Sequence, residues 1–169
     1  SSIVSNGTNV GNFLDVDTHM HVFDFYRAWH LSTALSQVYF ASAIKDRYNG
    51  EKLTGAFYGS NDGQDVFDPS TAGGVLEILN SDAIDFLAAP GVYVNRQPGG
   101  FTGQREMPDS FALRNKLFIV EEDTRTHLEV PHYKAMFDYY DMDDTREILE
   151  RDFGRNLCEN LPAWWYDHH

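Results

Sequence analysis

The sequence of 169 residues predicts an α/β protein with a parallel β-sheet. Four short apolar runs bounded by turn residues have the length and composition of strands. They cover residues 52–58, 84–89, 116–121 and 162–167. The segments between them carry the apolar spacing of helices, and this alternation of strands and helices predicts that successive strands run parallel.

Two helices have clear apolar patterns. The first contains Phe23, Tyr26, His30, Val38, Ala41 and Ile44, and the last contains Ile148, Leu149, Phe153, Leu157 and Leu161. Asn49 and Gly50 predict the end of the first helix, since both residue types tolerate the backbone conformation that terminates helices. Asp143, Asp144 and Thr145 predict the start of the last helix, because they supply capping oxygens and negative charge.

The run at residues 116–121 predicts a central strand. Leu117 and Ile119 fall on one face and Phe118 and Val120 on the other, as expected for a parallel strand covered on both sides. Four such units are half of the eight in a closed (β/α)₈ barrel (TIM barrel), which needs roughly 250 residues. We therefore expect either a piece of a longer protein or a chain whose missing half comes from another chain.

Charge and composition restrict the partners. The chain has 13 basic and 26 acidic residues, a formal charge of -13, so we expect no nucleic acid or anionic membrane as a partner. No apolar stretch is long enough to span a bilayer, and no signal peptide is evident, so we expect a soluble chain, cytoplasmic or secreted with its signal outside this sequence. A single cysteine, Cys158, excludes an intrachain disulfide.

One candidate site for metal-dependent chemistry lies near the start of the chain. Asp17, His19 and His21 resemble the His-x-His that ends the first barrel strand of metal-dependent amidohydrolases, where two imidazoles on one face bind one metal. The later predicted strands end in Tyr58, Tyr93 and Glu121 instead of further histidines. The alternative is that His19 and His21 lie in a polar loop before the first helix.

A second candidate site follows the central strand. Residues 116–128 are predicted to form a buried strand that ends at Glu121 and continues as a charged loop. Glu121 and Glu122 should point to opposite faces, and substitution of Glu122 should matter much less. This run resembles the nucleophile strand of clan A barrel glycoside hydrolases related to family-42 β-galactosidases, in which Lys-Leu-x-x-x-Glu-x-Asp-x-Arg-Thr-His recurs. Residues 45–59, 79–100, 151–154 and 161–167 resemble, in order, other segments of the same group.

The resemblance implies that the chain supplies strands 5–8 of the barrel. Residues 1–23 are then a loop region after strand 4, and residues 24–169 are the C-terminal half of the barrel domain. Retaining glycosidases use two carboxylates about 5–5.5 Å apart. The resemblance makes Glu121 the nucleophile on strand seven and places the acid/base glutamate on strand four, upstream of Ser1.

The resemblance also implies roles for other residues. Arg125 and Tyr93 are suited to lower the pKa of Glu121 through a positive charge and a donated hydrogen bond. Trp165 is favoured over Trp164 as the platform for the sugar. The remaining candidates for hydrogen bonds to sugar hydroxyls are Tyr58, Asn95, Arg96, His127 and Asp167. The structural alternatives are a salt bridge from Arg125 to Glu121 or Asp123 and ordinary loop positions for the rest.

The sequence thus predicts a retaining glycoside hydrolase, similar to β-galactosidases, that acts by double displacement without metal or cofactor. We expect a carbohydrate substrate, and we expect the isolated chain to be inactive and to pair with the missing half barrel or to self-associate. The two alternatives are a metal-dependent amidohydrolase that uses His19 and His21 and a non-catalytic carbohydrate-binding barrel fragment.

Overall fold

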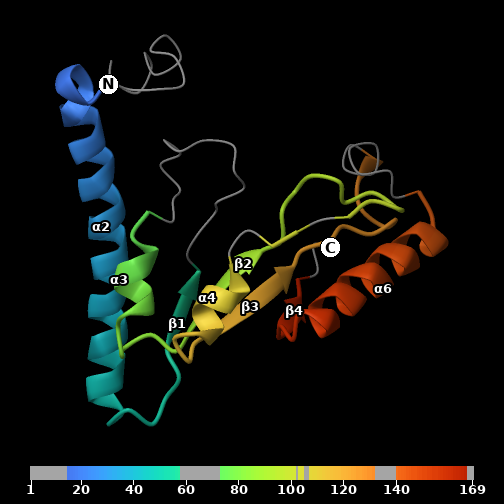
Figure 1. The fold of residues 1–169 in the computed structure, drawn as a ribbon. Helices are drawn as coiled ribbons and strands as arrows, with labels where there is room; N and C mark the ends of the chain where they lie inside the picture. Colours follow the sequence, from blue (N-terminus) through green and yellow to red (C-terminus); the bar gives the residue numbers. More distant parts are fainter. Residues whose placement is uncertain (1–14, 58–72, 102, 105–106, 132–139, 167–169) are drawn as a thin grey trace.

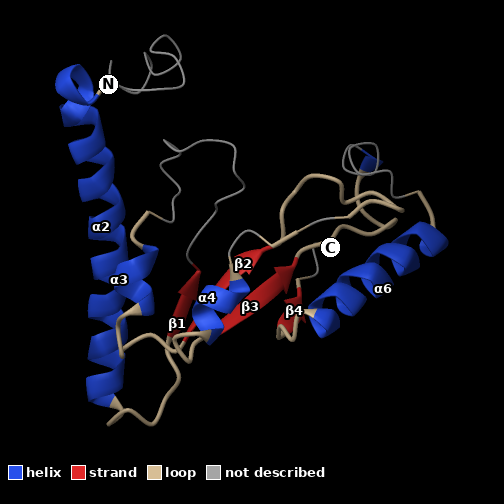
Figure 2. Cartoon of the chain, viewed as in Figure 1, coloured by secondary structure: helices blue, strands red, loops and turns tan. Residues whose placement is uncertain are grey.

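The computed structural model of the chain describes residues 15–57, 73–101, 103–104, 107–131 and 140–166. Helices and strands alternate along these residues (Figures 1 and 2). Their order is α2 (Val16–Arg47), β1 (Gly55–Phe57), α3 (Val75–Leu79), β2 (Phe86–Pro90), α4 (Pro108–Ala112), β3 (Leu117–Glu122), α6 (Met142–Cys158) and β4 (Ala163–Trp165).

The four strands form one parallel sheet in the order β1-β2-β3-β4. This confirms the predicted α/β class and the predicted parallel sheet. Each strand pairs with its neighbour in the sequence, and a segment containing a helix joins each strand to the next. All four strands fall within the apolar runs that predicted them, apart from one residue at the end of β2 and one at the end of β3.

The helices pack on one face of this sheet. Phe118 and Val120 of β3 are 2% and 0% exposed and lie on this face with Leu87 and Ala89 of β2. They form one core with residues of three helices, Ala34 and Ala41 from α2, Ile78 and Leu79 from α3, and Phe111 from α4. The rings of Phe111 and Phe118 lie 5.2 Å apart.

The opposite face of the sheet, here called the open face, is less covered. Leu117 of β3 is 49% exposed there, so the prediction that β3 is covered on both sides holds for one face among the described residues. Gly55 and Phe86 share the open face, and a Cβ on Gly55 would lie 2.4 Å from the Phe86 ring. Glycine at this position therefore allows that ring to approach the backbone of β1 closely.

The helix ends are set by local hydrogen bonds. The Asp15 carboxylate accepts the N–H of Asp17 and caps α2, so residues 16–23 are helical and their prediction as part of a loop region was wrong. At its other end α2 stops at Arg47, followed by Asn49 and Gly50 with φ of 51° and 75°, as predicted. No helix in the described part of the chain is long and apolar enough to cross a membrane.

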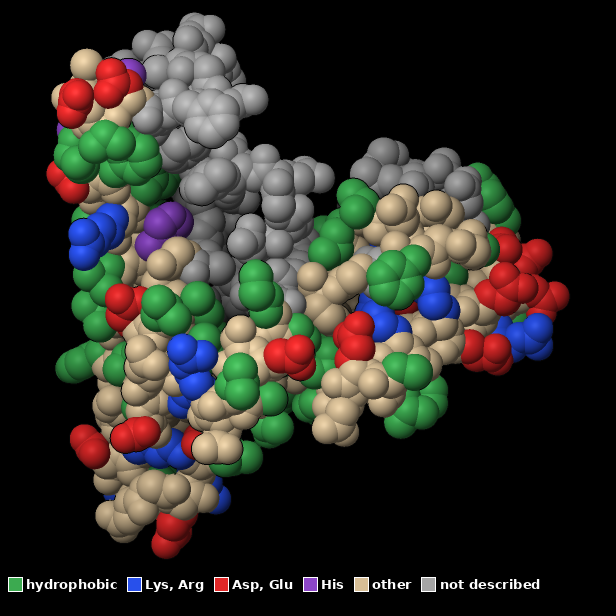
Figure 3. All heavy atoms as spheres, viewed as in Figure 1, with side chains coloured by type: hydrophobic (Ala, Val, Ile, Leu, Met, Phe, Trp, Pro, Cys, Tyr) green, Lys and Arg blue, Asp and Glu red, His purple; other side chains and the backbone are tan. Residues whose placement is uncertain are grey.

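Helix α6 begins slightly earlier than the sequence indicated. Its cap is Asp141, which forms a capping box with Asp144. Further acidic side chains gather over this end of the helix (Figure 3). Because the amino end of a helix carries partial positive charge, these acidic groups stabilise α6 where it starts.

Candidate active site at the carboxyl end of the sheet

Glu121 lies at the carboxyl end of β3, a central strand, on the open face of the sheet. In the register of the sheet it pairs with Pro90 of β2 and Trp164 of β4, neither of which carries a charge. The Trp164 ring in turn meets Phe57 of β1 edge to face, with centroids 5.6 Å apart. A partly buried carboxylate is thus placed beside aromatic rings that project from both edge strands of the sheet.

Glu122, the next residue, points to the opposite face, as strand alternation predicted. Its side chain is 3% exposed and forms a 2.5 Å ion pair with Arg155 of α6. The amide of Asn156 donates a second bond to the same oxygen at 2.6 Å. Glu122 is therefore a buried group that joins β3 to α6, and Glu121 is the carboxylate available to a ligand.

The ionisation of Glu121 differs from the prediction. Burial raises the pKa of the Glu121 carboxyl above its ordinary value of 4.5, and the negative charge of Asp123 raises it further. The expectation that Arg125 and Tyr93 lower this pKa was wrong. Both side chains bind other carboxylates: Tyr93 donates to Asp123 at 2.6 Å, and Arg125 forms a 2.8 Å ion pair with Glu129.

Asp123 is the centre of a cluster that the sequence did not reveal. One carboxylate oxygen accepts the Tyr93 hydroxyl, and the other pairs with Nη1 of Arg96 at 2.6 Å. The Arg96 guanidinium also lies 4.2 Å from the centre of the Tyr93 ring. We call Asp123, Tyr93 and Arg96 the Asp123 clamp, because they join the loop after β2 to the segment after β3.

Arg96 is buried and directs three of its five N–H groups to protein acceptors, so the structure does not place it at a surface open to a sugar hydroxyl, contrary to the prediction. It is 4% exposed, and besides its bond to Asp123 it donates to the carbonyl oxygens of Val92 and Gly91. Its role is to hold the loop that contains it. In the sequence, Arg96 follows the predicted strand that precedes the Glu121 strand. That position does not distinguish a ligand-binding residue from a buried one.

The other predicted binding residues are dispersed. Asn95 is exposed in a left-handed turn with φ of 56°. The His127 ring and backbone N–H both bond to the Thr145 hydroxyl of α6, at 3.0 and 2.9 Å. Tyr58 and Asp167 lie outside the described residues.

The two neighbouring tryptophans of β4 lie on different faces of the sheet. Trp164 pairs with Glu121 and shares its face, whereas Trp165 pairs with Glu122 and is 49% exposed on the helix-covered face. The choice of Trp165 as the sugar platform therefore placed the wrong tryptophan beside Glu121. A one-residue difference in register exchanges the faces of two adjacent residues, and the sequence did not fix where the short strand begins.

Behind the sheet, buried polar groups fasten α6 to β3 and to the loop after β2. Asp152 is 1% exposed and accepts the Thr124 hydroxyl at 2.9 Å. Arg151 pairs with Asp152 and also donates to three loop carbonyls, those of Arg96, Gln97 and Gly100. A signal for this network was present in the sequence, since Asp152 and Arg155 fall on the same helix face as the buried Ile148.

The predicted alternative metal site is not formed. His19 and His21 lie within α2, so neither the strand end nor the polar loop considered for them was correct. Residues two apart on a helix point in different directions, even with the non-helical dihedrals at His19. The described residues contain no cluster of three or more His, Cys, Asp or Glu side chains able to hold a metal ion.

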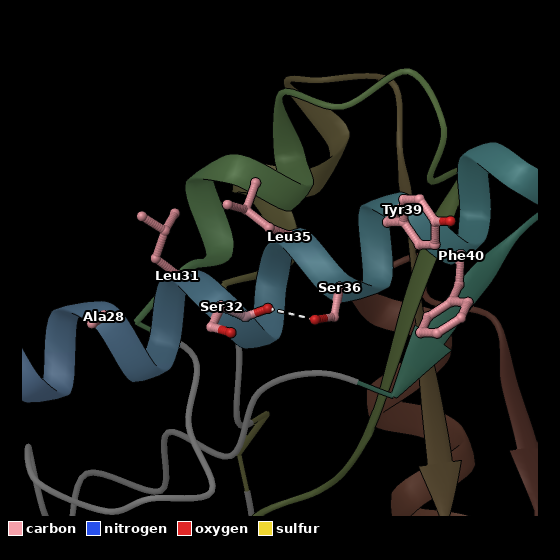
Figure 4. Close-up of a pocket in the computed structure, with 7 residues that line it drawn as sticks. All are labelled: Ala28, Leu31, Ser32, Leu35, Ser36, Tyr39 and Phe40. Carbon is pink, nitrogen blue, oxygen red and sulfur yellow. Dashed lines mark hydrogen bonds between the residues drawn. The ribbon is translucent and has the colours of Figure 1, made fainter.

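A separate apolar groove of about 540 Å³ lies along α2 (Figure 4). Its lining consists of Ala28, Leu31, Ser32, Leu35, Ser36, Tyr39 and Phe40. At about 100° per residue, Leu35 and Tyr39 lie roughly 100° and 140° around the helix from Ala34, which is buried in the core. The groove contains no ionisable acid or base suited to catalysis near neutral pH, and it is distinct from the Glu121 site.

No protein-family model, curated protein sequence or solved structure matches the chain.

Proposed function

We propose that this chain is half of a (β/α)₈ barrel that belongs to a retaining glycoside hydrolase, with Glu121 as the catalytic nucleophile. The observation that carries the proposal is the position of Glu121. It is partly buried at the carboxyl end of a central parallel strand, on the open face, in register with Trp164. Catalytic groups of barrel enzymes lie at the carboxyl ends of strands.

The order and direction of the four strands support a (β/α)₈ barrel as the complete fold. Its four parallel strands follow one another in sequence order, as strands do around a (β/α)₈ barrel. The core formed with α2, α3 and α4 lies on one face, which corresponds to the outside of a barrel. The open face, with Phe57, Ile119 and Trp164, corresponds to the interior, which is filled by side chains in a closed barrel.

In this proposal Glu121 attacks the anomeric carbon and forms a covalent glycosyl-enzyme intermediate. A second carboxylic acid protonates the leaving oxygen and then activates the water that hydrolyses the intermediate. That second group belongs to the other half of the barrel, so the present half alone has no efficient hydrolysis. Trp164, beside Glu121, supplies an apolar face for the C–H groups of the sugar ring. A β-galactoside or a similar β-glycoside is the proposed substrate.

Chemical rescue tests this function in the complete protein. Glu121→Gly removes the nucleophile, so hydrolysis of an aryl β-glycoside should fall by about 10⁴-fold or more. Azide should then restore turnover and give a glycosyl azide of inverted configuration, because it attacks from the vacated side. Glu51→Gly, at an exposed loop position, is the matched control and should keep full activity.

Two outcomes would redirect the proposal. Unchanged activity in Glu121→Gly would exclude Glu121 as the nucleophile. If the complete protein hydrolyses no glycoside, yet a saccharide changes the fluorescence of Trp164, the non-catalytic carbohydrate-binding function would replace hydrolysis.

A further inference from the structure

We propose that Asp123 is a positioning residue of the Glu121 site, which fixes the loop after β2 against the end of β3 and holds its own carboxylate in place two residues from Glu121. This inference rests on the proposed function for its catalytic consequence only. The geometry that supports it is independent of any reaction.

Asp123 is held firmly by two side chains of the loop after β2. Both carboxylate oxygens accept bonds of 2.6 Å, from the Tyr93 hydroxyl and from Nη1 of Arg96, and the residue is 8% exposed. Short bonds to a cation and a hydroxyl stabilise the ionised form of a carboxyl group. These two short bonds therefore hold the Asp123 carboxylate in one orientation.

Through Arg96, Asp123 fastens the loop that follows β2. Arg96 donates to the carbonyl oxygens of Gly91 and Val92, directly after β2. From the other side Arg151 of α6 donates to the carbonyl oxygens of Arg96, Gln97 and Gly100. The loop after β2, at the same end of the sheet as Glu121, is thus held between β3 and α6, and Asp123 is its attachment to β3.

Asp123 and Arg96 also lie near the two glutamates at the end of β3 and influence their pKa values. The Asp123–Arg96 ion pair affects the two neighbouring carboxylates in opposite ways. Asp123 raises the pKa of Glu121, in addition to the effect of burial. Burial also raises the pKa of Glu122, but there the positive charges of Arg155 and Arg96 oppose it.

A fixed negative charge beside the nucleophile has a catalytic use. The transition state of glycoside cleavage carries positive charge on the sugar ring, and an oriented carboxylate stabilises that charge without reorganising. The same charge makes Glu121 easier to protonate. Burial is the larger cause of the raised pKa of Glu121, and repulsion from Asp123 adds to it. The neighbours of Glu121 across the sheet, Pro90 and Trp164, carry no charge.

The direct test is the pKa of Glu121, measured by isotope-edited carboxyl NMR on the full chain. Asp123→Asn should lower the pKa of Glu121, because it removes the repulsion and keeps the size of the side chain. Tyr93→Phe keeps the charge and should not lower it. Asp46→Asn, an exposed matched control on α2, should leave it unchanged. If Asp123→Asn fails to fold, added salt should lower the pKa of Glu121 in the wild-type chain by screening the same repulsion.

The second measurement is kinetic and uses the complete enzyme. Asp123→Asn should lower kcat/KM by about 10²-fold, as misplacement of a catalytic group does, and should move the acid limb of the pH profile to lower pH. If Asp123 had only a structural role, Asp123→Asn would lower activity without moving the acid limb of the pH profile. A pKa of Glu121 that neither Asp123→Asn nor salt lowers would overturn the inference. If the complete protein hydrolyses no glycoside while Asp123→Asn still lowers the pKa of Glu121, the proposed function would be overturned and the electrostatic role of Asp123 would remain.

Discussion

The ring of Phe57 and the indole of Trp164 meet edge to face at 5.6 Å, although β1 and β4 are the two outer strands of the sheet. In a flat sheet three strand spacings would separate these strands by roughly 14 Å. Ala88, between Phe57 and Ile119 in register, is only 2% exposed on this face. The sheet therefore curls toward its open face, which is the curvature that a barrel requires.

Removing this ring contact should weaken the fold and change the environment of Trp164. Phe57→Ala should lower the free energy of unfolding by about 1 kcal/mol or more and shift the Trp164 fluorescence to longer wavelength. Urea unfolding and emission spectra measure the two effects. Phe153→Ala, at a similarly exposed position on α6, should cost less and leave the emission unchanged. Equal effects of both variants would show that the contact does not support the curl.

The buried pair of Glu122 and Arg155 should behave as one unit. Arg155→Met leaves Glu122 buried without its cation and should cost about 3–5 kcal/mol in unfolding free energy. The double variant with Glu122→Gln should lose much less than the sum of the two single losses, because neither charge is left alone. Denaturant unfolding of the four proteins measures this coupling, and additive losses would contradict it.

This pair also changes how substitutions at the two glutamates must be interpreted. The sequence predicted that Glu122 matters little, because it faces away from the site. The structure agrees on its direction but shows that it holds α6. Activity lost in a Glu122 variant can therefore reflect unfolding, and its stability must be measured beside its activity.

Asp85 should make stability depend on pH. Burial alone would raise its pKa, but the bond from Lys45 at 2.6 Å and the backbone N–H of Thr54 at 2.7 Å outweigh burial and lower the pKa below 3.8. A carboxyl whose pKa falls on folding stabilises the fold above its unfolded pKa, and the effect is lost as pH falls through the folded pKa.

Asp85→Asn should therefore cost about 2 kcal/mol near neutral pH and clearly less near pH 3. Urea titrations at the two pH values give the comparison, with the exposed Asp82→Asn as control. A loss of the same size at both pH values would show that the ionised form of Asp85 contributes nothing.

The elements of the fold followed from local pattern. A continuous run of apolar residues predicted β3, and Asn49 and Gly50 predicted the end of α2, because strands and helix ends depend on residues close in sequence. The start of α2 was missed because a single carboxylate, Asp15, caps it without an apolar pattern to mark it. Side chains alternate between the two faces along a strand, and this correctly predicted that Glu121 and Glu122 point to opposite faces.

The partners of the site residues did not follow from pattern. Tyr93 and Arg125 were assigned to Glu121 by residue type, but Tyr93 reaches Asp123 across thirty residues and Arg125 pairs with Glu129, four residues along the chain. Which carboxylate a donor reaches depends on the path of the loops. That path is set by long-range bonds such as those from Arg151, which no local rule predicts.

The nucleophile assignment is tested most directly by trapping the glycosyl-enzyme intermediate in the complete protein. A 2-fluoro β-glycoside inactivator should form a stable ester, because the fluorine slows its hydrolysis more than its formation. Peptide mass spectrometry should then locate the sugar on Glu121, the carboxylate on the open face beside Trp164. A label on Glu122, or inactivation of a hydrolytically active enzyme through a residue outside this strand, would contradict the assignment.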